Sequence, residues 1–149
     1  MNQETAIATV GHAIQLSVAP VFLISSIGAL LAVLTSRLAR VVDLARACEA
    51  KLAAAAEAEL PPLHAFLNTL SRRAKLINVA ITFCTITAIL VCAVIATLFV
   101  GAFMAFDASV LIAILFVAAM SLLIVGLMYF LREIFIATAS LRIGPRETR

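Results

Sequence analysis

Three long stretches without any charged residue constrain the fold of this chain more than any other feature. Residues 5–36, 76–106 and 108–131 contain no Asp, Glu, Lys or Arg. A helix needs about 20 consecutive apolar residues to cross the hydrocarbon core of a bilayer, and each stretch is longer than that. The chain of 149 residues is also 64% hydrophobic, whereas soluble domains average about 45–50%. The sequence therefore predicts an all-α integral membrane protein with three transmembrane helices.

We expect these helices to form a single membrane domain over residues 1–149. Its predicted segments are a first transmembrane helix at about 11–36, a polar hairpin at 37–75, a second transmembrane helix at about 76–105 and a third at about 108–131. Asp107 is a favourable N-cap for the third helix. That helix is predicted to continue into the cytosol to about residue 143, where Gly144 and Pro145 favour a helix end.

The polar segment 37–75 has the pattern of an antiparallel coiled-coil hairpin. Apolar residues recur at spacings of three and four on two stripes, which are Leu38, Val41, Ala45, Cys48, Leu52 and Ala55 on the first arm and Leu63, Leu67, Leu70, Ala74, Ile77 and Ile81 on the second. This spacing is typical of coiled coils. Pro61 and Pro62 are predicted to mark the turn, because a residue before proline avoids helical geometry.

The positive charges predict the orientation of the chain. Seven of the Lys and Arg residues lie in the segment 37–75 and four lie after residue 131, whereas none lies near the N-terminus or between the last two stretches. Short loops rich in Lys and Arg stay in the cytosol. We therefore expect the N-terminus outside, with the hairpin and the C-terminus in the cytosol. This orientation also accounts for the net charge of +3, so no nucleic-acid partner is predicted.

Four segments of the chain resemble a family of small bacterial inner-membrane proteins that is catalogued as a domain of unknown function. They are APVFLISSIGALL at 19–31, SRLARVVDLARA at 36–47, SRRAKLIN at 71–78 and LREIFIATASLRIG at 131–144. The resemblance covers about residues 18–142. Family members often have an Arg after the Asp of the second segment, where this chain has Leu44. The resemblance implies a three-span protein of the bacterial inner membrane and implies no activity.

The first candidate site is a charged girdle where the helices are predicted to meet the cytosol. Its members are Arg37, Arg40, Asp43, Arg72, Arg73, Lys75, Arg132 and Glu133. The six positive and two negative charges leave a net +4. The main interpretation is contact with anionic lipid headgroups, and the alternative is the basic mouth of an oligomeric pore. Asp43 lies three residues from both Arg40 and Arg46, a spacing that allows it to pair with either.

The second candidate site is a stripe of small and polar residues on the second predicted span. It consists of Asn78, Thr82, Thr85, Cys92 and Ala96, with Ile89 interrupting it. In lipid, small and hydroxylated residues favour contact between helices, so we interpret this stripe as a packing surface. The alternative is the lining of a polar pore.

Neither site has the composition of a catalytic, metal or cofactor centre. The chain has no Walker motif, no HExxH, no CxxC and no Gly-rich phosphate loop. His12 and His64 are predicted on opposite sides of the membrane, so they cannot share a metal. We expect a non-catalytic protein without cofactors, a homo-oligomer in the bilayer whose hairpin is open to a cytosolic protein partner. The alternative is an oligomeric ion channel.

Overall fold

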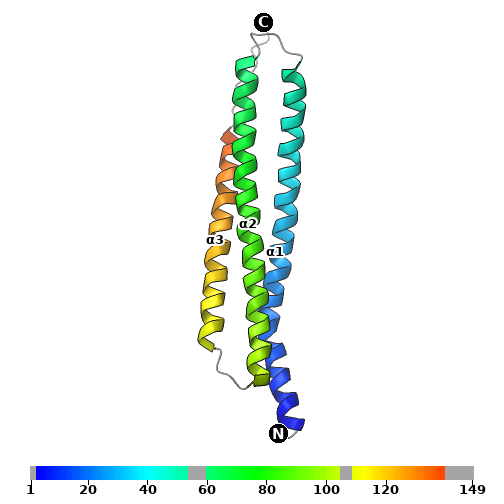
Figure 1. The fold of residues 1–149 in the computed structure, drawn as a ribbon, viewed down its shortest axis with the longest axis vertical. Helices are drawn as coiled ribbons and strands as arrows, with labels where there is room; N and C mark the ends of the chain where they lie inside the picture. Colours follow the sequence, from blue (N-terminus) through cyan, green and yellow to red (C-terminus); the bar gives the residue numbers. More distant parts are fainter. Residues whose placement is uncertain (1–2, 54–59, 105–108, 140–149) are drawn as a thin grey trace. The chain divides into compact units, whose positions relative to one another are not determined.

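The chain forms three long α-helices in a computed structural model, which describes residues 3–53, 60–104 and 109–139. They are α1 (Gln3–Leu52), α2 (Leu60–Met104) and α3 (Ser109–Ala139), labelled in Figure 1. Each contains a segment long and apolar enough to cross a membrane, namely Ile14–Leu52, Leu60–Gly101 and Ser109–Thr138. The all-α fold is confirmed, and the three spans indicate a multi-pass membrane protein.

The helix boundaries differ from the sequence-based expectation at one proline pair. Pro61 and Pro62 were predicted to form a turn, and this prediction is wrong because α2 begins at Leu60 and includes both prolines. A first-turn N–H has no acceptor within the helix, so proline loses nothing there. At the other end of the chain, α3 begins at Ser109. Asp107 and the predicted extension over residues 140–143 lie outside the described residues.

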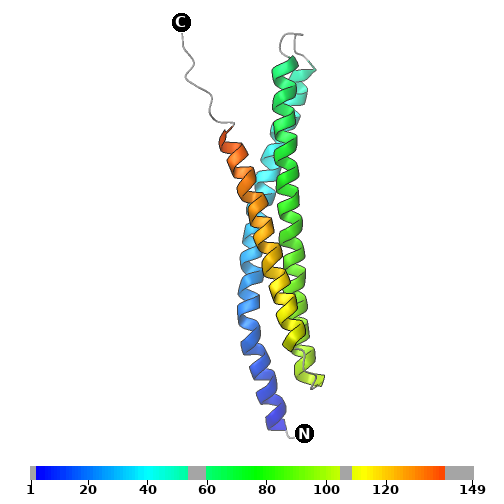
Figure 2. The ribbon, with the colours of Figure 1, turned by 90° about the vertical axis from the view of Figure 1, so that its left-hand side faces the viewer.

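The chain divides into two compact units, and every helix contributes a part to each. The first, which we call the apolar unit, contains Met1–Ala32 and Thr82–Val125. The second, which we call the charged unit, contains Val33–Ile81 and Gly126–Arg149. Within each unit, the part of α2 runs antiparallel to the parts of α1 and α3, as the two perpendicular views in Figures 1 and 2 show.

The apolar unit has the surface of a protein that is solvated by lipid. Its buried positions are Ile27, Val91 and Val94 together with small or polar residues such as Ser17, Cys84, Thr87 and Ala119. Many other large apolar side chains face outward; the most exposed are Phe22, Ile89, Val110, Ile114, Val117 and Ile124. An apolar surface of this extent is unusual for a soluble monomer, and a hydrocarbon environment accounts for it.

Four hydroxyl groups in the apolar unit donate hydrogen bonds within their own helix. Ser26 donates to the carbonyl oxygen of Phe22 at 3.0 Å, and Thr87 donates to that of Phe83 at 2.9 Å. Thr97 and Ser121 make the same type of bond, each to the carbonyl four residues earlier. Because the bilayer core offers no water, such internal bonds are what a membrane helix requires of its hydroxyl groups.

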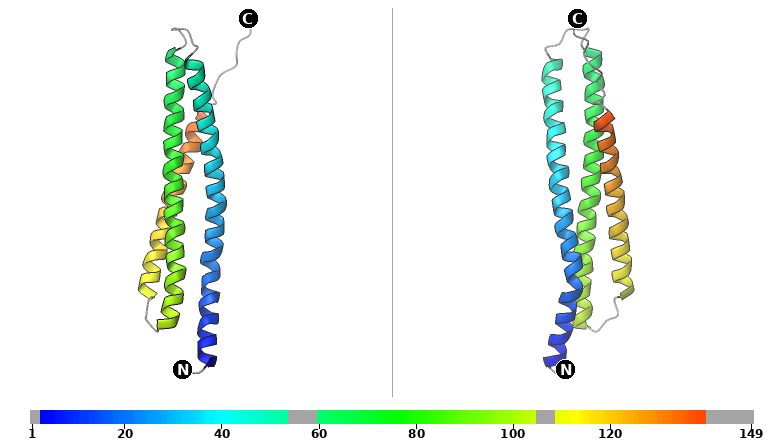
Figure 3. Two further views of the ribbon diagram at one scale, coloured as in Figure 1. Left: turned by 45° about the vertical axis from the view of Figure 1, so that its right-hand side comes forward. Right: turned by 180° about the vertical axis from the view of Figure 1, so that it is seen from behind.

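In the charged unit, α1 and α2 pack through the two apolar stripes found in the sequence. Figure 3 shows these two helix segments side by side. Val41 and Cys48 on α1 are buried, as are Leu70 and Ile77 on α2. The other described stripe residues are half-buried and none is exposed, while Ala55 lies outside the described residues. The seven-residue interval between buried positions on each helix is typical of coiled-coil packing.

Candidate functional site

A buried carboxylate on α3 is the centre of an ion-paired polar site in the charged unit. The side chain of Glu133 has 0% exposure to solvent. It follows Ala119 and Gly126 at intervals of seven residues, and all three positions are buried. Small residues let helices approach closely, so Ala119 and Gly126 are the kind of residue expected where α3 packs. Glu133 continues this buried face of α3 with a charged group.

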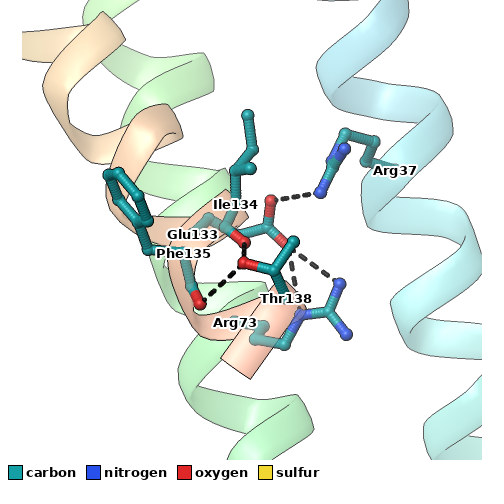
Figure 4. A network of polar contacts seen from close by, with 6 residues as sticks. All are labelled: Arg37, Arg73, Glu133, Ile134, Phe135 and Thr138. Carbon is teal, nitrogen blue, oxygen red and sulfur yellow. Dashed lines mark hydrogen bonds and ion pairs between the residues drawn. The ribbon is translucent and has the colours of Figure 1, made fainter. Parts of the chain in front are cut away.

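Two arginines from the other helices bind the two oxygens of this carboxylate (Figure 4). Arg73 on α2 donates to Oε1 of Glu133 from both Nε, at 3.0 Å, and Nη2, at 2.9 Å. Arg37 on α1 donates to Oε2 from Nη2 at 2.7 Å. Hydrogen bonds between charged groups are about twice as strong as neutral ones. One carboxylate therefore connects all three helices of the charged unit.

Arg37 makes a second contact with α3. Its guanidinium carbon lies over the ring of Phe130, at 5.5 Å from the ring centroid, which is within the range of cation–π attraction. Phe130 precedes Glu133 by three residues, so both lie on the same side of α3. The Nε atom of Arg37 is buried and has no hydrogen-bond partner among the described residues. Its pairing with Glu133 is thus less complete than that of Arg73.

The ion pairs of this cluster are suited to holding the three helices of the charged unit together. The two guanidinium groups and one carboxylate carry a net +1, and side-chain exposure is 33% for Arg37 and 18% for Arg73. The net gain from a buried ion pair over apolar packing is small, but removal of one partner is costly because a charge is left buried and unpaired. Among the residues that the structure describes, no group of three His, Cys, Asp or Glu side chains could hold a metal ion.

The structure brings together three of the eight girdle residues, which are Arg37, Arg73 and Glu133. The other five are exposed, and they are Arg40, Asp43, Arg72, Lys75 and Arg132. Asp43 forms no ion pair with Arg40 or Arg46 within the described ranges. The girdle therefore consists of an inward cluster that is ion-paired and a set of outward charges.

The polar stripe on α2 lies on one face of that helix. All five of its residues are exposed: Asn78 in the charged unit, and Thr82, Thr85, Cys92 and Ala96 in the apolar unit. Ile89, which interrupts the stripe, is also exposed. The buried residues of α2, among them Cys84, Thr87, Val91 and Val94, lie on the opposite side of the helix. The packing of the single chain thus leaves the stripe uncovered.

Sequence reasoning included Glu133 in the girdle but missed that it is the centre of an ion-paired cluster, and it missed Phe130 altogether. The usable signal was the interval of seven residues from Ala119 through Gly126 to Glu133. This signal is weak in sequence, because nearly every residue of α3 is apolar and hides the periodicity. The pairing partners also come from helices that are distant along the chain.

The sequence was compared with models of known protein families. A family model described as "Protein of unknown function (DUF2721)" matches residues 17–143. The chain belongs to the DUF2721 family. The resemblance inferred from sequence is thereby confirmed, and the matched region of this DUF2721 protein contains the Glu133 cluster and the α2 stripe. The comparison with curated proteins found no match, and neither did the comparison with solved structures.

Proposed function

We propose that this DUF2721 protein is a non-catalytic membrane protein that assembles into a homo-oligomer through the polar stripe on α2. The observation that carries this proposal is the exposure of all five stripe residues: Asn78, Thr82, Thr85, Cys92 and Ala96. Lipid tails gain nothing from contact with hydroxyl and amide groups. Another helix can pack closely against a face of small and hydroxylated residues.

We also propose that residues 37–75 of the charged unit project into the bacterial cytosol as an antiparallel coiled-coil hairpin. The burial of both apolar stripes supports the hairpin. The seven Lys and Arg residues of the segment 37–75 support a cytosolic location. In this arrangement the N-terminus lies outside the inner membrane. The exposed arginines and Lys75 contact anionic headgroups, and the hairpin is open to a cytosolic protein partner.

Cys92 provides a direct test of the interface, because it lies in the stripe and is exposed while Cys48 and Cys84 are buried. Oxidation of the protein in membranes with copper phenanthroline is expected to produce a covalent dimer through Cys92, detected on a non-reducing gel. The Cys92→Ser variant should give no dimer. As a matched control, Val117→Cys in the Cys92→Ser background places a thiol on an exposed site of α3. Equal dimer from this control would contradict the proposed interface.

The orientation has its own test. An alkaline phosphatase fusion at the C-terminus is expected to be inactive in a bacterial host, because that enzyme matures only outside the cytosol. A green fluorescent protein fusion at the same site should fluoresce. Strong phosphatase activity would place the C-terminus outside and would reverse the proposed topology, without bearing on the α2 interface.

The second candidate function is an oligomeric ion channel. It is favoured by the hydroxyl and amide groups of the same α2 face and by the exposed charges Arg40, Arg72, Lys75 and Arg132. Purified protein in liposomes separates the two functions. A conductance that Arg72→Ala alters would favour the channel, whereas no flux under a range of ions and membrane tensions favours the non-conducting assembly.

A further inference from the structure

An apolar groove on α3 adjoins a positive charge that the Glu133 cluster does not use. The groove lies in the charged unit, has a volume of about 440 Å³, and is lined by Met128, Tyr129, Leu131, Arg132 and Phe135. Met128 is 61% exposed and Phe135 is 65% exposed. These side chains present an apolar surface outward, away from the buried residues of the same helix.

Arg132 has a different environment from its sequence neighbour Glu133. Successive residues of a helix point about 100° apart, so the two side chains occupy different faces of α3. Both oxygens of Glu133 are taken by Arg37 and Arg73, while Arg132 is exposed. Within the part of the chain that the structure describes, Arg132 has no ion pair. Its guanidinium therefore remains available to an external anion.

The position of Arg132 along the helix fixes the depth of this charge. Residues 108–131 are uncharged, and Arg132 is the first charged residue after them. The part of this stretch that belongs to α3, residues 109–131, spans about 35 Å at 1.5 Å per residue, compared with about 30 Å for the hydrocarbon core. Arg132 accordingly lies at the depth of the headgroups, and Met128 and Leu131 lie toward the acyl chains.

We propose that this groove binds one anionic phospholipid. The phosphate accepts hydrogen bonds from the guanidinium of Arg132, and an acyl chain lies against Met128 and Leu131. The occupant is a lipid because the groove opens on the outward, apolar side of a membrane helix. It is anionic because, among the described residues that line the groove, the only charged one is an arginine. This site rests on the proposed contact of the exposed arginines with anionic headgroups and makes it specific. It is independent of the proposed assembly, since it uses α3 rather than the stripe on α2.

The chain contains no tryptophan, which allows a site-specific fluorescence test on the full-length protein. Met128→Trp places a reporter in the groove, and Val117→Trp places a control reporter at an equally exposed site of α3 outside it. Each variant is reconstituted into phosphatidylcholine bilayers that contain a small fraction of brominated phosphatidylglycerol or brominated phosphatidylcholine. Quenching by the bromine atoms measures which lipid occupies the reporter's surroundings.

The Met128→Trp reporter is expected to show a preference of about fivefold for phosphatidylglycerol over phosphatidylcholine. This is the preference expected from the attraction of one arginine near the headgroups for an anionic lipid. Adding Arg132→Gln should reduce this preference to about one, while Lys51→Gln, which removes an exposed positive charge in the last turn of α1, should leave it unchanged. The Val117→Trp reporter should show no preference. The proposal is overturned if both reporters respond alike, or if Arg132→Gln leaves the preference intact.

Discussion

Replacement of Glu133 by glutamine is expected to lower the free energy of unfolding by about 3 kcal/mol. Glutamine keeps the shape of the side chain but removes the charge that pairs with Arg37 and Arg73. Breaking a buried ion pair on one side typically costs about 3–5 kcal/mol. The lower end applies here because both arginines retain some contact with solvent. Unfolding in detergent, followed by circular dichroism, measures this change.

Two comparisons separate the cluster from a general effect of removing charge. Asp43→Asn changes an exposed carboxylate and should cost less than about 1 kcal/mol. The triple variant Arg37→Met, Arg73→Met, Glu133→Met replaces the whole cluster by apolar side chains and should recover most of the lost stability. Equal losses for Glu133→Gln and Asp43→Asn would show that the cluster does not hold the three helices together.

The second large effect is expected on assembly. The double substitution Thr85→Phe, Ala96→Phe puts two bulky rings on the exposed face of α2. Backbones that approach closely cannot accept such rings, and overpacking costs about 1–3 kcal/mol per site. The dissociation constant of the oligomer should therefore rise at least about tenfold, as sedimentation in detergent would measure.

A matched control uses the exposed face of α3. Ile114→Phe and Val117→Phe enlarge two side chains that already point outward, so they should leave the assembly unchanged. If the α3 pair dissociates the oligomer as strongly as the α2 pair does, the interface includes α3 and the proposed surface is wrong. If neither pair has an effect, the stripe does not mediate assembly.

The regular features of the fold could be predicted because the bilayer imposes them on sequence. The uncharged stretches indicated three helices, and the spacing from Val41 to Cys48 and from Leu70 to Ile77 indicated which sides of α1 and α2 are buried. The prediction at Pro61 and Pro62 was wrong because proline is common both in the turn before a helix and in the first turn of the helix itself. A short turn and a first helical turn have the same sequence signal there.

The Glu133 cluster could be predicted only in part, for a physical reason. Charge counting placed Arg37, Arg73 and Glu133 at one depth, but depth does not determine rotation about a helix axis. On α1 and α2 the rotation can be read from the alternation of polar and apolar residues. On α3 both the buried and the lipid-facing sides are apolar, so the sequence carries little information about which side Glu133 occupies.

We expect the protein to be an oligomer built on the exposed face of α2. Native mass spectrometry of the wild-type protein, released from mild detergent or lipid nanodiscs, tests it most directly. One chain has a mass of 15.8 kDa. We predict a single main species at a whole-number multiple of that mass, two or greater, that persists on dilution. A species at 15.8 kDa alone, at every protein concentration, would contradict this expectation.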